Sequence, residues 1–70
     1  MNTLEFVKQQ LSVEEIAKLR NIHSMRNRES RLVELKTFFN QPTIFNKIAP
    51  TIDPMWLVNN LHNHCNEFQI

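Results

Sequence analysis

Apolar residues recur at helical spacing in the first part of the chain. Leu4 and Val7 share one side of a predicted short helix over about residues 3–10. Ser12 is followed three positions later by Glu15, which is the spacing of a capping box. In that motif each side chain accepts a hydrogen bond from the backbone N–H of the other residue. A second helix is therefore predicted to begin directly after Ser12.

The apolar pattern changes near Arg20. The apolar residues that follow lie on a stripe rotated by roughly a third of a turn from the stripe that precedes it. Two interpretations stay open. Either the helix breaks over residues 21–24, with Asn21 in the left-handed conformation and Ser24 capping the next helix, or one helix continues over about residues 12–39 with a polar band at mid-length. We favour the break.

Prolines mark the start of the later elements. Pro42 suits the first turn of a short helix over residues 42–49. Asp53 can accept a hydrogen bond at an N-cap and Pro54 fits the first helical position, so a last helix is predicted to run to about Glu67. The predicted buried side of that helix consists of Trp56, Leu57, Leu61, Phe68 and either His64 or Cys65.

Glycine is absent from all 70 residues. Sheets joined by tight hairpins rely on glycine for positive φ, whereas helices can end at asparagine or proline. The composition therefore predicts an all-α protein. We expect residues 1–70 to form a single domain, a small helical bundle of about four helices, two short and two longer.

The expected environment follows from what the sequence lacks. Cys65 is the only cysteine, which excludes an intrachain disulfide and suits a reducing compartment. The longest apolar run, residues 55–58, is too short to cross a bilayer, and the first ten residues lack the pattern of a signal peptide. We expect a cytoplasmic protein that does not enter a membrane and needs no cofactor.

All four arginines fall within twelve residues: Arg20, Arg26, Arg28 and Arg31. The guanidinium group binds carboxylates and phosphates through two parallel hydrogen bonds, so such a cluster suits an acidic protein surface or a nucleic-acid backbone. His23 lies among the arginines and is included in the candidate site. The alternative is a solvated helix face on which the arginines pair with nearby glutamates at i,i+3 spacing.

The aromatic side chains are numerous for so short a chain. One small core can rarely cover all of them, so a remaining exposed patch would mark a contact surface. We expect this patch on Phe38, Phe39 and Phe45, or along Trp56 and Leu57. A homodimer formed through such a patch is a further expectation.

The segment Leu11–Ile22 resembles the first half of a helix-turn-helix, the DNA-binding motif of many repressors. The resemblance is carried by Ile16, Ala17, a turn-like Asn21 and Ile22. It implies a dimeric DNA-binding regulator, with the next helix presented to DNA. The chain departs from the motif where Arg20 and Asn27 occupy positions that are apolar in it.

Catalysis and metal binding find little support in the sequence. His62, His64 and Cys65 are close in sequence but do not share one helix face, whereas zinc needs three or four converging ligands. No local pattern joins a nucleophile, a base and an acid. We therefore predict no metal site and no enzymatic activity.

The sequence as a whole favours a small regulatory or inhibitory protein that acts by binding. Its predicted contact with an acidic protein surface combines the arginines and His23 with the aromatic pair Phe38 and Phe39. The alternative function is a dimeric DNA-binding transcriptional regulator with a degenerate helix-turn-helix.

Overall fold

The computed structural model describes residues 3–64, and within them the chain forms five helices and no strand. The helices are α1 (Thr3–Gln10), α2 (Val13–His23), α3 (Arg28–Asn40), α4 (Pro42–Ile48) and α5 (Pro54–Asn63). The all-α prediction is confirmed. In this part of the chain five helices, two short and three longer, replace the expected four.

The local signals for helix ends operate as predicted. The hydroxyl of Ser12 accepts from the Glu15 N–H at 3.2 Å, and the Glu15 carboxylate accepts from the Ser12 N–H at 2.8 Å, which completes a capping box at the start of α2. Asp53 caps α5 by accepting from the Met55 N–H at 3.0 Å. Gln41 is extended because Pro42 follows it, so α3 ends and α4 begins at the same residue.

The break after α2 lies later than predicted. Asn21 is still helical, and no residue of 3–64 has the positive φ that we expected of it. Ser24 ends α2 by donating from its backbone N–H to the Arg20 carbonyl and from its hydroxyl to the Asn21 carbonyl. Asn27, not Ser24, caps the next helix by accepting from the Ser30 N–H at 3.0 Å. The choice of a broken helix was right, and the assignment of the caps was wrong.

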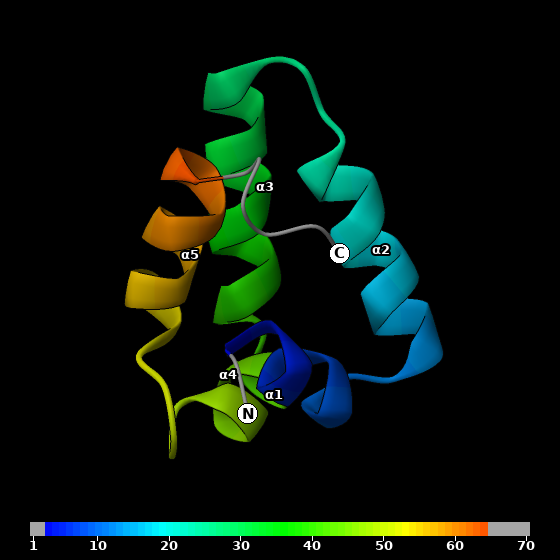
Figure 1. The fold of residues 1–70 in the computed structure, drawn as a ribbon, viewed down its shortest axis with the longest axis vertical. Coiled ribbons are helices and arrows are strands. Elements are labelled where there is room, and N and C mark those ends of the chain that lie inside the picture. Colours follow the sequence, from blue (N-terminus) through cyan, green and yellow to red (C-terminus); the bar gives the residue numbers. More distant parts are fainter. Residues whose placement is uncertain (1–2, 65–70) are drawn as a thin grey trace.

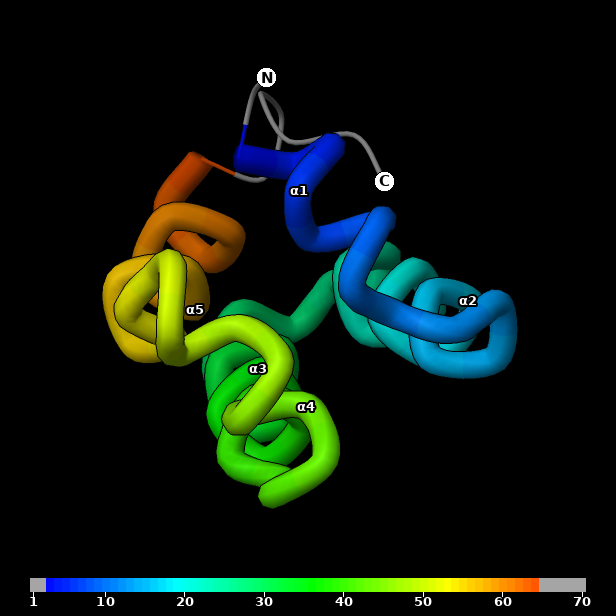
Figure 2. The backbone as a smooth tube through the Cα atoms, turned by 90° about the horizontal axis from the view of Figure 1, so that it is seen from below, coloured from blue at the N-terminus to red at the C-terminus, as the bar shows by residue number. Residues whose placement is uncertain are grey.

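The helix α3 is the centre of the molecule. It packs against α5 on one side and α2 on the other, and α4 packs against its C-terminal end (Figure 1). The short helices α1 and α4 contact each other at the end of the molecule where α3 terminates (Figure 1). Seen from below, α4 lies over the end of α3, and α1 lies between α2 and α5 (Figure 2). The arrangement thus differs from a bundle of four aligned helices.

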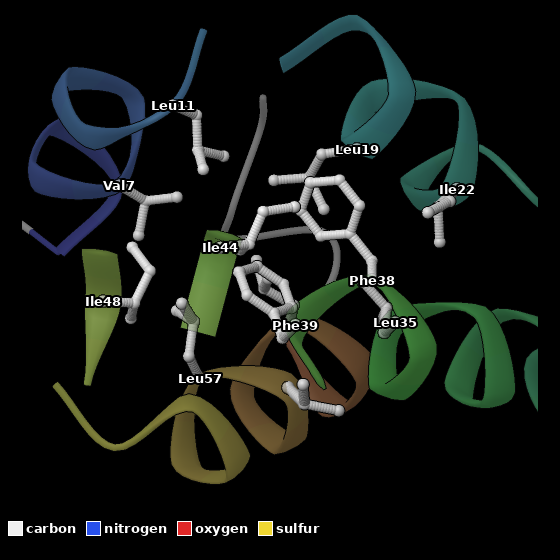
Figure 3. Close-up of a cluster of buried hydrophobic side chains, with 12 residues drawn as sticks. Val7, Leu11, Leu19, Ile22, Leu35, Phe38, Phe39, Ile44, Ile48 and Leu57 are labelled. Atoms are coloured by element: carbon white, nitrogen blue, oxygen red, sulfur yellow. The ribbon is translucent and has the colours of Figure 1, made fainter. Parts of the chain in front are cut away.

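All five helices contribute to one apolar core (Figure 3). Phe38 points from α3 toward Leu19 of α2, whereas Phe39 points toward Leu57 of α5 (Figure 3). The two rings meet edge to face, with centroids 5.0 Å apart. The buried apolar residues are Val7, Leu11, Leu19, Ile22, Leu35, Phe38, Phe39, Ile44, Ile48, Leu57, Val58 and Leu61.

No helix in the described part of the chain is long and apolar enough to cross a membrane.

Candidate partner-binding surface

Two exposed arginines lie at the connection between α2 and α3. Arg26 lies in the connection and Arg28 is the first residue of α3, and both side chains are exposed. Within residues 3–64, neither forms an ion pair with a carboxylate. The connection is fixed at both ends, by Ser24 closing α2 and by Asn27 capping α3. Two guanidinium groups are therefore presented to solvent from a well-defined backbone.

Arg20 and His23 lie in the last turn of α2, at the same end of the molecule (Figure 1). Arg20 is exposed and His23 is partly buried, and each makes a contact of its own within the chain. These two residues border the connection, whereas Arg26 and Arg28 form its exposed part.

Arg31 does not belong to the exposed cluster. Its side chain is only 7% exposed, so the prediction that it is displayed to a partner is wrong. The physical reason is its register: Arg31 lies four residues before Leu35 and seven before Phe38, on the face of α3 that enters the core.

The buried guanidinium group joins the ends of two other helices. Its Nη1 donates to the Met25 carbonyl at 3.2 Å, just after α2, and its Nη2 donates to the His62 carbonyl at 3.4 Å, in the last turn of α5. Carbonyl groups at helix C-termini lack intrahelical donors and carry partial negative charge. Arg31 therefore stabilises the junction of α2, α3 and α5. Its Nε is buried and has no partner among the described residues.

Phe38 and Phe39 are also absent from the surface. They are 2% and 0% exposed, so the predicted aromatic patch at these two positions is wrong. They are buried because α3 is the central helix, with neighbours on both sides. Among the other aromatic residues proposed for a patch, Phe45 on α4 and Trp56 on α5 stay partly exposed, while Leu57 is buried.

Lys36 of α3 and His62 of α5 lie near Arg28 and Arg31 at the seam between these two helices, and sequence reasoning did not include them in the candidate site. Burial and the positive charges of Arg28, Arg31 and Lys36 together lower the pKa of His62 below its ordinary value. His62 is partly buried, and Lys36 is exposed. The sequence could have indicated Lys36 as a site residue, because its spacing of eight residues from Arg28 places both on one side of α3.

Within residues 3–64, the carboxylates of Glu15, Glu29 and Glu34 lie outside this seam. Glu15 pairs with Lys47 of α4 at 3.1 Å, at the opposite end of α2. Its bonds to Ser12 and Lys47 outweigh partial burial, so the pKa of Glu15 is lowered. Glu29 and Glu34 line a shallow hollow of about 300 Å³ on the outer side of α3, with Val33 and Ser30 between them.

Within residues 3–64, no three His, Cys, Asp or Glu side chains gather closely enough to hold a metal ion. Cys65 and Phe68, which the sequence predicted on the buried side of the last helix, lie outside the described residues.

No family model matches this chain, and its comparison with curated proteins and with solved structures gives no significant match. The surface is therefore interpreted from its own residues.

Proposed function

We propose that this protein is a non-catalytic regulatory or inhibitory domain that docks on an acidic surface of another protein. The observation that carries the proposal is the pair Arg26 and Arg28, both exposed and without an ion-pair partner among residues 3–64. Arginine forks recognise carboxylates through two parallel hydrogen bonds, and their planar groups lose less freedom on binding than a lysine does.

The arginines would act mainly on encounter and orientation. Charged groups at the rim of an interface raise the association rate and fix the register of the complex more than they add affinity. The capped connection contributes because its backbone is already ordered before the partner arrives, which reduces the entropy lost on binding.

The exposed aromatic residues belong to a different part of the molecule. Phe45 and Trp56 lie on α4 and near the start of α5, at the end opposite the α2–α3 connection (Figure 1). We therefore propose that the arginines dock on the partner without Phe38 and Phe39, which the sequence analysis had included in the contact. Trp56 is 48% exposed, and a second copy of the chain is the partner we propose for that end. Light scattering at two protein concentrations tests this, and the mass of a monomer at both would contradict it.

Two features of α3 favour protein docking over DNA reading. A recognition helix turns its exposed face into a groove, whereas the exposed outer face of α3 carries the carboxylates of Glu29 and Glu34. Its first turn also carries Glu29 beside Arg28, and a carboxylate there opposes the approach of phosphates.

The test compares two double variants of the immobilised protein. Arg26→Gln/Arg28→Gln removes the exposed guanidinium pair, and Lys8→Gln/Lys18→Gln removes two exposed charges elsewhere as the matched control. We expect wild type and control to retain the same partner from a lysate, and the arginine variant to lose it while its circular dichroism is unchanged.

Equal capture by both variants would overturn the proposal. Retardation of a random DNA duplex at low salt, released steeply as salt rises and lost only in the arginine variant, would replace it with the DNA-binding alternative.

A further inference from the structure

One row of α3 faces the side on which α5 packs. Phe39 points toward Leu57 of α5, and Leu32 precedes it by seven residues, or about two turns (Figure 3). Arg28 and Lys36 lie one turn before and after Leu32, so all three share this side of the helix. Leu32 is partly buried against the core, while the two cations are exposed.

The facing helix adds no charge of opposite sign. Between Pro54 and Asn63, α5 contains no aspartate, glutamate, lysine or arginine, and its titratable residue is His62. Arg31 holds the end of α5 against this row through its bond to the His62 carbonyl. Burial is the main cause of the lowered pKa of His62, and the positive charges of Arg28, Arg31 and Lys36 add to it. Glu29, the neighbour of Arg28, is the nearest carboxylate in sequence.

We propose that the row of Arg28, Leu32 and Lys36, with His62 beside it, binds an extended acidic segment of the partner. The inference deepens the proposed function, on which it rests, by naming the footprint and the chemistry of the ligand. The bound segment carries a carboxylate at positions i and i+4 and an apolar residue at i+2.

The spacing of the row supports this ligand. Successive members of the row are four residues apart, which corresponds to about 6 Å along the helix axis. Side chains on one face of an extended peptide recur every second residue, at about 6.6 Å. A carboxylate, an apolar group and a second carboxylate can thus meet Arg28, Leu32 and Lys36 in register. A nucleic-acid strand offers phosphates at similar intervals, but no aliphatic side chain lies between successive phosphates to cover Leu32.

The experiment is a titration of ¹⁵N-labelled full-length protein, at low salt, with the capped pentapeptide Glu-Ser-Leu-Ser-Glu. We expect amide shifts to concentrate at Arg28, Leu32, Lys36 and His62, with a dissociation constant in the millimolar range, as befits so few contacts. The peptide Glu-Ser-Ser-Leu-Glu keeps both carboxylates but moves the leucine to the wrong face, and it should bind about two- to fivefold more weakly.

Three variants test whether the peptide binds at the row of Arg28, Leu32 and Lys36. Lys36→Gln should weaken the pentapeptide about two- to fivefold, because an exposed ion pair contributes little more than that. Lys8→Gln, the matched control on α1, should leave its affinity unchanged. Glu29→Gln removes the adjacent carboxylate and should strengthen binding, by about twofold.

The outcomes separate this inference from the proposed function. Four results would overturn this inference, even if the arginine variant still loses its protein partner. They are equal binding of the two peptides, amide shifts at other residues, no shifts up to about 5 mM peptide, and unchanged peptide affinity in the Lys36→Gln variant. Tighter binding of oligothymidylate at the same residues would overturn it in favour of nucleic acid. Partner capture that is unaffected by the loss of Arg26 and Arg28 would refute the proposed function, and the row would then not be the partner's site even if the peptide binds to it.

Discussion

Replacing Phe39 by leucine tests the placement of the aromatic residues. The Phe39 ring is fully buried and meets Phe38 edge to face with centroids 5.0 Å apart. Leucine keeps the site apolar but loses the ring contact, which is worth about 0.5–1.5 kcal/mol, and leaves a small volume unfilled. We expect a loss of about 1–1.5 kcal/mol in the free energy of unfolding.

This loss is large for a domain of 70 residues. Marginal stability of about 0.05–0.15 kcal/mol per residue corresponds to about 4–10 kcal/mol in total. Phe39→Ala would remove about 3–5 kcal/mol, enough to unfold part of the population, so leucine is the more informative change. With a urea dependence of about 1 kcal/mol per molar, Phe39→Leu should lower the unfolding midpoint by about 1 M.

The matched control is the same change at Phe45, which is 37% exposed. Phe45→Leu should shift the midpoint by less than about 0.5 M. Both variants are unfolded in urea and followed by circular dichroism at the helical band and by the fluorescence of Trp56. Equal midpoints for the two variants would refute the inward placement of Phe39 and return it to the list of surface residues.

Three further predictions concern the caps and the buried charges. Ser12→Ala breaks the capping box of α2 and should cost about 1 kcal/mol in urea unfolding; an unchanged midpoint would show that the cap contributes nothing. Arg31→Met leaves the Met25 and His62 carbonyls without their donor, so the free energy of unfolding should fall by about 1–3 kcal/mol. A more stable variant would mean that burying the Arg31 charge costs more free energy than its hydrogen bonds return. The pKa of His62 is lowered in the folded state, so the unfolded chain takes up the proton first, and stability should fall as the pH drops below the ordinary histidine value of about 6.5. His62→Gln should flatten this slope below about pH 6.5, and an identical slope would contradict the expectation.

The sequence alone determined the elements that depend on neighbouring residues. The capping box at Ser12, the aspartate cap at Asp53 and the stop before Pro42 each involve groups within three positions of one another. The chain has no glycine, and in agreement with this no residue of 3–64 has a positive φ, so none of its helices ends in the left-handed conformation. These signals are local, so they could be read without knowing what each helix packs against.

The tertiary structure alone decided which of the polar and aromatic side chains face outward. Arg31 looked like Arg26 and Arg28 in sequence, and its burial depends on a carbonyl 31 residues away on α5. Phe39 is covered and Trp56 is half exposed because α3 has neighbours on both sides, whereas α5 lies at the edge of the helix group. Burial is a property of non-local contacts, and the helical period fixes which residues share a face but not what covers that face.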